Sequence, residues 1–290
     1  MDLTGAAPVV CVGGRTQWDV GGAPVAGAVE VRAPAGVLDY EPAEMVVRVG
    51  AGTTVAELDG VLGAHGQMVP LDAPDPDRAT VGGVLAVGRS GLRRLRYGPV
   101  RDTLLEARLA MADGTVVKAG GPVVKNVTGY DLCRLFVGSL GTIGFLAEAV
   151  LRCQPRPRVA RWIRSDGADP FDARRRLFRP SSILWDGAAT WVLLEGSEAE
   201  VAAERDQLDR AWVDVDGPPP VPRGSRSSMR PSELRSLSGD FVAEVGVGTV
   251  HRAAGDALGP GVPPSTVAIF ERVKAAFDPT GRMNPGRQPW

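Results

Sequence analysis

Three glycine-rich segments contain the residues whose types and spacing favour ligand binding by the main chain. They span residues 13–22, 79–98 and 120–144, and the last of them reads GGPVVKNVTGYDLCRLFVGSLGTIG. A glycine has no Cβ, so it lets the backbone approach a ligand closely. Because three such segments occur far apart in one chain, they predict a single long ligand held by many backbone N–H groups.

A nucleoside triphosphate site is the first alternative that these glycines raise. Gly83 and Gly88 have the spacing of a phosphate-binding P-loop, but Arg89 stands where that motif needs a lysine. A planar guanidinium cannot take the place of a compact ammonium there, and Gly91 is a poor residue for the helix that follows a P-loop. A nucleotide-binding phosphotransferase therefore ranks third, behind two hypotheses that the complete set of motifs favours.

A dinucleotide-binding fingerprint is the second alternative, and the sequence does not contain it. Residues 138–144 follow a G-x-x-G-x-x-G rhythm, and Gly246 and Gly248 lack the third glycine that packs helix against strand in a Rossmann unit. Taken alone, each cluster is more often a turn than a site. Their joint arrangement is what favours a ligand.

Length, composition and charge exclude several classes of protein. The chain has 290 residues, 44% of them hydrophobic, so it can bury one large core or two smaller ones. Its 33 basic and 34 acidic residues give a formal charge of −1. Nucleic-acid-binding proteins usually carry a basic surface, so the partners expected here are small molecules or proteins.

The cysteines and the N-terminus indicate a cytoplasmic protein. Cys11, Cys133 and Cys153 are far apart and lack the Cys-x-x-Cys spacing of zinc or iron–sulfur sites, so we expect buried thiols in a reducing compartment. The first residues contain no basic region followed by an apolar stretch, and no run of about 18 apolar residues occurs. Secretion and membrane insertion are not expected.

Apolar patterning predicts mixed strands and helices in the first half of the chain. Thr54 and Glu57 have the spacing of a capping box and predict a helix that ends near Gly66. Strands are expected at 44–49, 105–111 and 115–118, and the turn signal at 113–114 joins the last two as a hairpin.

Two prolines within residues 154–158 predict a boundary, because proline lacks the N–H that a strand ladder needs. A second unit is expected beyond it, with strands at 159–164, 182–185, 190–195 and 241–250 and helices at 170–178 and 198–212. This β-α-β-β-α-β order is typical of a ferredoxin-like layer. Residues 217–228 are expected to form an exposed spacer, and a helix capped by Ser265 should precede a turn-rich tail at 278–287.

Six motifs together resemble one known family. They are GGRTQ-x3-GG at 13–22, ATVGG at 79–83, RYGPVRD at 96–102, KNVTGYD at 125–131, GSLGTIG at 138–144 and DP-x-G-x-x-NPG at 278–286. With these motifs the chain is similar to FAD-binding domains of the vanillyl-alcohol oxidase type, also called PCMH type. Within that family it most resembles the FAD-binding subunits of bacterial glycolate oxidases.

The resemblance implies an α+β fold, with a PCMH-type FAD-binding domain of two α+β subdomains and a small ferredoxin-like cap. The FAD-binding domain is expected at 1–157, the cap at 158–264, and a C-terminal helix and tail that return to the first domain at 265–290. Relatives that attach flavin covalently often carry a histidine in the first glycine segment, and residues 12–22 contain none. Non-covalent FAD is therefore expected.

The resemblance also implies which residues contact FAD. The turns at 13–17 and 79–83 are expected to hold the pyrophosphate and ribityl chain, and residues 138–144 the adenine half, because consecutive N–H groups form anion-binding nests. Asn284 and Arg287 should return near the flavin. The expected cofactor residues are Gly13, Gly14, Arg15, Thr16, Gln17, Asp72, Ala79, Thr80, Gly82, Gly83, Ser90, Gly91, Tyr97, Gly98, Lys125, Tyr130, Asp131, Gly138, Ser139, Gly141, Ile143, Gly144 and Asn284.

Oxidation of a 2-hydroxy acid needs a base for the hydroxyl proton, a hydride acceptor and a clamp for the carboxylate. The chain has only two histidines, His65 at an expected exposed helix end and His251 at the end of a cap strand. The candidates for catalysis are His251, Tyr97 and Arg96. Catalytic relatives carry a histidine-rich metal cluster in the cap, which residues 159–264 lack, so no metal site is expected.

The expected function is that of an FAD-dependent oxidoreductase chain that takes part in the oxidation of glycolate or D-lactate, with hydride transfer to FAD. The resemblance implies a second flavoprotein subunit and an iron–sulfur subunit as partners, because this chain has too few cysteines to hold a cluster. The alternative is an accessory flavin-binding or electron-relay subunit with no substrate site of its own.

Overall fold

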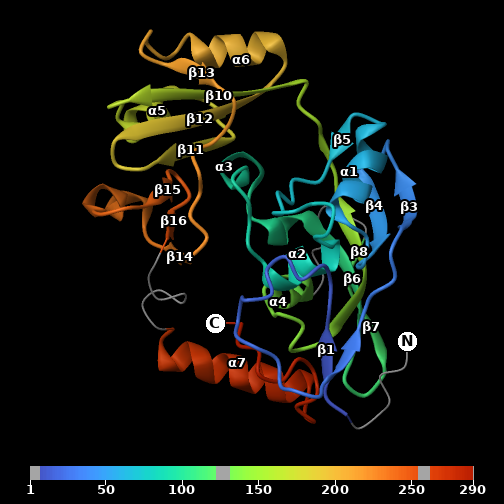
Figure 1. Cartoon of the computed structure of the whole chain (residues 1–290). Helices are drawn as coiled ribbons and strands as arrows, with labels where there is room; N and C mark the ends of the chain where they lie inside the picture. Colours follow the sequence, from blue (N-terminus) through green and yellow to red (C-terminus); the bar gives the residue numbers. More distant parts are fainter. Residues whose placement is uncertain (1–6, 122–130, 254–261, 290) are drawn as a thin grey trace. The chain divides into compact units, whose positions relative to one another are not determined.

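The computed structural model describes residues 7–121, 131–253 and 262–289, and the chain has an α+β fold (Figure 1). It divides into two compact units. Of the described residues, the first unit contains those up to 91, those within 99–156 and those from 263 onward, and the second contains residues 92–98 and those within 157–262. The chain therefore crosses between the units four times.

A five-stranded antiparallel sheet forms the centre of the first unit. Its order is β3 (Val37–Glu41), β4 (Val46–Gly50), β8 (Phe145–Arg152), β6 (Leu104–Ala110) and β7 (Val116–Gly120). The predicted hairpin between β6 and β7 is confirmed. Asp113 accepts the N–H of Thr115 at 2.9 Å, and Gly114 takes the left-handed conformation that such a turn requires, with a φ of +85°.

Four helices of the first unit share an apolar core with this sheet: α1 (Val55–Gly63), α2 (Val81–Val87), α4 (Leu132–Phe136) and α7 (Pro264–Phe277). The predicted cap at Thr54 is confirmed, since its hydroxyl accepts the N–H of Glu57 at 3.1 Å. The predicted cap at Ser265 is wrong. Helix α7 begins at Pro264, which has no N–H to satisfy, and no side chain caps it.

Two short strand pairs and one turn of 3-10 helix complete the first unit. Strands β1 (Val9–Cys11) and β2 (Val29–Val31) are parallel, β5 (Gln67–Met68) and β9 (Gln154–Pro155) are antiparallel, and the 3-10 turn covers Val100–Thr103. The N–H of Val9 donates to the carbonyl of Arg282 at 2.9 Å. A segment of the C-terminal tail thus meets β1 directly before the first glycine segment.

The second unit contains a seven-stranded antiparallel sheet. Its order is β13 (Val213–Val215), β10 (Val159–Asp166), β12 (Ala189–Gly196), β11 (Ser182–Trp185), β15 (Val242–Glu244), β16 (Thr249–Arg252) and β14 (Ser225–Ser228). Together with α5 (Pro170–Arg176) and α6 (Glu198–Arg205), the strands β10 to β13 have the ferredoxin-like connectivity, with the fourth strand beside the first.

Three details of the second unit differ from the sequence prediction. The fourth strand is β13, and residues 241–250 instead contribute the hairpin of β15 and β16, which is turned by Gly246 and Gly248 at φ values of +87° and +90°. The predicted spacer at 217–228 contains β14, whose polar sequence has no apolar alternation to reveal a strand. The helix predicted at 198–212 ends at Arg205.

The two faces of the seven-stranded sheet have different surroundings. Ala173 of α5 and Val201 of α6 pack with Ile163 and Val192 on one face. Trp191 belongs to a separate apolar cluster on the opposite face. A short helix, α3 (Arg94–Tyr97), and a 3-10 turn at Pro231–Ser236 also belong to this unit. None of the helices in the described parts of the chain has the length and apolar character needed to cross a bilayer.

Candidate functional site

Main-chain turns from distant segments meet at the end of β1. A Cβ placed on Gly13 would lie 2.3 Å from Oγ1 of Thr80, and a Cβ on Gly141 would lie 3.2 Å from the sulfur of Cys11. The first of these distances leaves no room for a side chain, and the second leaves very little. The first glycine turn therefore packs directly against the second, and the third packs against β1.

The second turn leads into helix α2. The hydroxyl of Thr80 accepts the N–H of Gly83 at 3.1 Å, which is the bond expected of a helix N-cap. The N–H of Gly82 donates to the carbonyl of Ala51 at 2.7 Å, and a Cβ on Gly82 would lie 2.9 Å from the Cβ of Ala51. This turn therefore contributes a close-packed wall, and the N–H groups of Gly82 and Gly83 are already hydrogen-bonded within the protein.

The first turn offers donors without a protein partner. Among the residues that the structure describes, the N–H groups of residues 13–17 form no hydrogen bond, whereas those of Cys11 and Val12 are paired with Asn284 and Val31. Arg15 has a left-handed backbone with a φ of +58°. Consecutive N–H groups around such a residue form a concave site for an anion. The turn is thus suited to bind phosphate.

The third turn is held in an uncommon backbone conformation. The φ values are +86° at Gly138, +52° at Leu140 and +69° at Gly141. A leucine rarely adopts this region because its Cβ is crowded there, so the surrounding contacts must impose it. The Oγ of Ser139 accepts the N–H of Gly141 at 3.3 Å, and the N–H of Leu140 donates to the carbonyl of Ala86 at 2.8 Å.

Asn284 joins the first and third segments from the C-terminal tail. Its Oδ1 accepts the N–H of Cys11 and its Nδ2 donates to the carbonyl of Leu140, both at 2.8 Å. Its own N–H donates to the carbonyl of Val9, also at 2.8 Å, and the residue is buried. Its side chain therefore positions the two segments. A contact between Asn284 and the cofactor stays a prediction.

Arg287 fixes the second half of the first glycine segment. Its Nη1 donates to the carbonyls of Trp18 and Val20, at 2.6 and 2.8 Å. Its guanidinium lies 4.3 Å from the centre of a Trp18 ring, and the guanidinium of Arg15 lies 4.8 Å from the same residue's ring, both within the range of cation–π attraction. Burial lowers the pKa of Arg287. The tail and the first segment therefore form one structure.

An ion pair at the end of α7 fixes the tail to the third turn. The Nζ of Lys274 contacts the carboxylate of Asp278 and donates to the carbonyls of Thr142 and Met283, at 2.6 and 2.7 Å. Burial acts to raise the pKa of Asp278, but hydrogen bonds from Lys274 and from the N–H of Met283 bring that pKa below its ordinary value. The carboxylate is therefore held in its ionised form.

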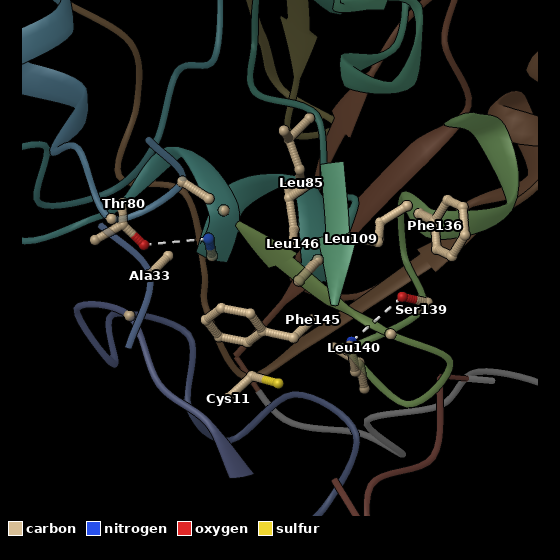
Figure 2. Close-up of a pocket in the computed structure, with 18 of the residues that line it drawn as sticks. Cys11, Ala33, Thr80, Leu85, Leu109, Phe136, Ser139, Leu140, Phe145 and Leu146 are labelled. Carbon is tan, nitrogen blue, oxygen red and sulfur yellow. Dashed lines mark hydrogen bonds between the residues drawn. The ribbon is translucent and has the colours of Figure 1, made fainter. Parts of the chain in front are cut away.

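These turns surround a cavity of about 160 Å³ within the first unit (Figure 2). Figure 2 shows Cys11, Thr80, Ser139 and Phe145 around it, each from a different segment. Glycine backbones and the two hydroxyl side chains line one part of the cavity, and leucine and phenylalanine side chains line the rest. A narrow space with amide donors and an apolar wall fits a ligand that combines phosphate with a ring system.

Seven of the predicted cofactor residues line this cavity: Gly13, Thr80, Gly82, Gly83, Ser139, Gly141 and Gly144. Eight more of the predicted residues belong to the same turns or hold them together: Gly14, Arg15, Thr16, Gln17, Ala79, Gly138, Ile143 and Asn284. Lys125 and Tyr130 lie outside the described residues. The structure thus brings together the residues from the motifs at 13–17, 79–83, 138–144 and 284.

Four other predicted cofactor residues of the first unit do not line the cavity. A Cβ on Gly91 would lie 2.0 Å from the Cβ of Asp72, so these two residues pack together, and the Oγ of Ser90 accepts the N–H of Val100 at 3.0 Å. Asp131 caps α4 and contacts Arg134 at 2.9 Å. Tyr97 and Gly98 belong to the second unit, together with Arg96.

The sequence reasoning missed one wall of the cavity. Residues 32–33 and 51–52 line it, and a Cβ on Gly52 would lie 2.3 Å from the carbonyl of Ala33. The Gly-Ala-Gly sequence at 50–52, directly after a strand, was the available signal. Cys11 also lines the cavity, and burial raises the pKa of its thiol to about 12.

Polar side chains cluster on the face of the seven-stranded sheet opposite α5 and α6. Nε2 of His251 lies 2.8 Å from Oε1 of Glu244, and Nη2 of Arg226 lies 3.7 Å from the same oxygen. Oε2 of Glu244 and Oγ1 of Thr249, which is its cross-strand neighbour, are buried without a hydrogen-bond partner in the described structure. Buried polar atoms normally have partners, so these two atoms are candidates for ligand contacts.

The two remaining catalytic candidates, Arg96 and Tyr97, lie near a second buried acidic residue, Glu195. Oε1 of Glu195, on β12, accepts a hydrogen bond from Nε of Arg93 at 2.9 Å, and Arg96 donates to the carbonyl of Glu195. Burial and the charge of Glu195 raise the pKa of Tyr97. Arg96 and Tyr97 thus belong to one charged cluster of the second unit. No group of three metal-ligating side chains occurs in the part of the chain described here.

Two family models match the chain in separate regions. The FAD binding domain matches residues 5–120, which include the first two glycine turns, and the C-terminal domain of FAD linked oxidases matches residues 232–287. The second match begins in the 3-10 turn at Pro231–Ser236 of the second unit and ends in the tail that holds the first unit's turns.

The chain is also similar to individual proteins. It is 34% identical to glycolate oxidase subunit GlcE of Escherichia coli over 214 residues, which is 71% of this chain and 61% of the relative. It is 37% identical to D-lactate dehydrogenase of Archaeoglobus fulgidus and 32% identical to glycolate oxidase subunit GlcD of Bacillus subtilis. Those two matches cover 42% of this chain and 27% and 26% of the relatives.

The fold is also found in a solved structure. Alkyldihydroxyacetonephosphate synthase superposes with a TM-score of 0.70 over 96% of this chain and 71% of that protein, at 16% sequence identity. An identity this low shows a shared fold and nothing about the reaction.

Proposed function

We propose that this chain, which belongs to the PCMH-type FAD-binding family, is the FAD-binding chain of an oxidoreductase. The proposed substrate is a small 2-hydroxy acid such as glycolate or D-lactate. The observation that carries the proposal is the meeting of the glycine turns around one cavity, with the N–H groups of residues 13–17 available to an anion. The two glycolate oxidase subunits and the D-lactate dehydrogenase among the similar proteins support the substrate class.

The first unit has the chemistry that FAD requires. The N–H groups at 13–17 would bind the diphosphate, the turn at 138–141 would approach the cofactor closely, and the apolar wall would cover a ring. No histidine lies in the first glycine segment, so the attachment is proposed to be non-covalent. When bound, FAD supplies the hydride acceptor for the oxidation of an alcohol.

The second unit supplies the proposed base. Because Glu244 is buried and lies 2.8 Å from Nε2 of His251, it would hold that nitrogen protonated and leave Nδ1 to accept the hydroxyl proton of a 2-hydroxy acid. Arg226 or Arg96 would bind the substrate carboxylate. Tyr97 is kept as the remaining candidate for catalysis.

The chain is proposed to work within a complex. The match covers 61% of GlcE and about a quarter of the other two relatives, and two of the three are named as subunits. We propose a second flavoprotein subunit as its partner, and an iron–sulfur subunit because the chain's three cysteines are far apart and none is in a disulfide. Free thiols also support a cytoplasmic location.

The second candidate function is an accessory flavin or electron-relay subunit without a substrate site. The observation that favours it is that the proposed base of the described residues is the single pair His251–Glu244, whereas the oxidation also needs a clamp for the substrate carboxylate. Anaerobic reduction separates the two candidates. A yellow protein bleached by glycolate or D-lactate alone would support an enzyme, and bleaching only with the partner subunits would support the accessory role.

An absorption spectrum tests the cofactor itself. The purified full chain should show the bands of oxidised flavin, and acid should release all of that flavin into the supernatant. Exchange of His251 for asparagine should then slow anaerobic bleaching without loss of flavin, whereas the same exchange at the exposed His65 should change neither. A folded chain that stays colourless with excess FAD would refute the proposal.

A further inference from the structure

Two arginines donate hydrogen bonds to consecutive carbonyls of the first glycine turn. Nη1 of Arg32 donates to the carbonyl of Gly13 at 3.1 Å, and Nη2 of Arg78 donates to the carbonyl of Gly14 at 3.3 Å. Arg32 follows β2, and Arg78 directly precedes the second glycine turn. Their side chains are 61% and 66% exposed, and exposed arginines gain little stability from such contacts. Their effect is therefore expected in the geometry of the turn.

The two bonds set the directions of the neighbouring N–H groups. In a trans peptide group, the carbonyl oxygen and the N–H of the next residue point in opposite directions, and the described chain contains no cis peptide bond. A donor on the oxygen of Gly13 therefore directs the N–H of Gly14 away from Arg32. In the same way, a donor on the oxygen of Gly14 directs the N–H of Arg15 away from Arg78.

These two N–H groups are the ones that an anion would use. Both belong to the run at 13–17 whose N–H groups form no hydrogen bond within the described residues. Arg15 has a φ of +58°, and a left-handed residue at this place turns consecutive N–H groups toward one concave site. If the carbonyls were not held, a ligand would have to order the turn as it binds, and its affinity would be lower.

The turn is supported by protein on two sides. A Cβ on Gly14 would lie 1.7 Å from the carbonyl oxygen of Arg78, and a Cβ on Gly13 would lie 2.3 Å from Oγ1 of Thr80. The turn thus rests on the main chain at 78–80, and Arg78 supports it with its backbone as well as its side chain. On the other side, Arg32 lines the cavity together with Gly13.

The charges around the turn favour an anion. Nη1 of Arg78 contacts Asp75 at 3.2 Å, and Nη2 of Arg32 lies 3.9 Å from Glu30, whose other oxygen contacts Arg15. These five side chains are three arginines and two carboxylates, which leaves one positive charge in excess. Hydrogen bonds in a chain also polarise one another, so a cation at a carbonyl strengthens the N–H of the same peptide group as a donor.

We propose that Arg32 and Arg78 are positioning residues for the diphosphate of FAD. By holding the carbonyls of residues 13 and 14, they direct the N–H groups of residues 14 and 15 toward the phosphate oxygens. The inference rests on the proposed function, because it takes FAD as the ligand. Both guanidinium groups lie on the carbonyl side of the turn. They therefore act through the main chain, unlike an arginine that binds phosphate directly through two parallel hydrogen bonds.

Binding of three ligands to the flavin-free full chain tests this role. FAD and ADP carry the diphosphate, whereas riboflavin carries only the flavin ring and ribityl chain. Arg32→Met and Arg78→Met should each weaken FAD and ADP binding by roughly 3- to 10-fold, the loss expected for one hydrogen bond. The double variant should lose roughly 10- to 100-fold, since the two bonds hold successive peptide groups. Riboflavin binding should stay unchanged.

Two further measurements separate positioning from other roles. Arg32→Lys and Arg78→Lys should bind ADP nearly as the wild type does, because a carbonyl needs one donor, whereas a bidentate phosphate contact needs a guanidinium. The ratio of wild-type to Met-variant affinity should also persist at about 1 M salt, where charges are screened beyond about 3 Å. Lysine variants as weak as the Met variants, or a ratio that falls to one at high salt, would overturn the inference.

Arg101→Met is the matched control, because Arg101 is an exposed arginine that lies 3.9 Å from Asp102. It should bind all three ligands as the wild type does, and equal melting temperatures of the flavin-free variants should show that each is folded. Unchanged ADP binding by the double variant, or an equal loss for riboflavin, would overturn the inference while FAD binding by the wild type stands. A wild-type chain that binds neither FAD nor ADP would instead refute the cofactor proposal, and the inference with it.

Discussion

Oδ1 of Asn284 accepts the backbone N–H of Cys11 at 2.8 Å across a separation of 273 residues. Nδ2 of the same amide donates to Leu140, so one side chain joins the end of β1 to the third glycine turn. The C-terminal tail therefore holds two walls of the cavity together, although the residues that line the cavity all lie between Cys11 and Leu146. Loss of this contact should affect folding and cofactor binding together.

Asn284→Ala should therefore destabilise the protein and weaken flavin retention. The exchange leaves the N–H of Cys11 and the carbonyl of Leu140 without their partner, and we expect a loss of about 2 to 4 kcal/mol in the free energy of unfolding. Urea unfolding of the flavin-free chain measures this loss, and flavin release on dilution measures retention. Gln288→Ala is the control, since that amide is exposed in the same tail. Equal unfolding midpoints for the two variants would contradict the role of Asn284.

Asp278 should make the stability of the first unit depend on acid pH. Its pKa is lowered in the folded chain, so the stabilisation is complete above the ordinary value of 3.8 and is lost as the pH falls through the lower folded value. Asp278→Asn should cost roughly 3 kcal/mol at neutral pH, because it leaves Lys274 without its buried partner.

Urea unfolding measures the effect of Asp278→Asn. It is carried out at neutral pH and at pH values below the pKa of an ordinary aspartate. The difference between wild type and variant should shrink as the pH falls through the folded pKa of Asp278. Asp77→Asn, at an exposed site, should leave the curve unchanged. A difference that stays constant over the same pH range would show that the charge of Asp278 contributes nothing.

The thiols should be unreactive in the folded chain. Burial raises the pKa to about 12 for Cys11 and to about 11 for Cys133 and Cys153, so very little thiolate is present at mildly alkaline pH. We expect labelling by a disulfide reagent to be slower by roughly 100-fold or more than in denaturant, where ordinary thiols titrate near 8.5. Fast labelling of Cys11 in the flavin-free native chain would show that the cavity wall opens.

The glycine turns could be predicted from the sequence because their signal is local. Close approach of a backbone needs glycine at that position, and Gly13, Gly82 and Gly141 each lie where a Cβ would collide. The bond between Asn284 and Cys11 could not be predicted from spacing, since nothing near either residue indicates its partner. Resemblance pointed to Asn284, but as a ligand contact and not as a link between two turns.

The sheet of the second unit shows a different limit of sequence reasoning. β13 has three residues, and its apolar pattern is too short to distinguish from a loop. The sequence therefore predicts the longer apolar segment at 241–250 as the fourth strand of the ferredoxin-like layer. The pairing of Glu244 with His251 depends on the register of the hairpin that this segment forms. A wrong strand assignment therefore concealed the one close His–carboxylate contact in the described structure.

Exchange of Gly141 in the third turn should distinguish the effect of a colliding Cβ from the effect of a strained left-handed backbone. Gly141 and Gly27 both have left-handed backbones, at φ values of +69° and +82°. A Cβ on Gly141 would lie 2.5 Å from Nδ2 of Asn284, whereas a Cβ on Gly27 would have no neighbour within 4 Å. Gly27→Ala should therefore cost only the conformational strain, about 1 kcal/mol, and keep its flavin.

Gly141→Ala should in addition displace Asn284 and lose flavin, and Gly82→Val should do the same by its collision with Ala51. The ratio of flavin to protein absorbance in each purified variant measures retention, and circular dichroism shows whether the chain is folded. Because Gly82 has an ordinary backbone conformation, its loss of flavin cannot come from strain in φ and must come from the lost close packing. Full colour in both folded variants would mean that the glycine turns do not form the cofactor site.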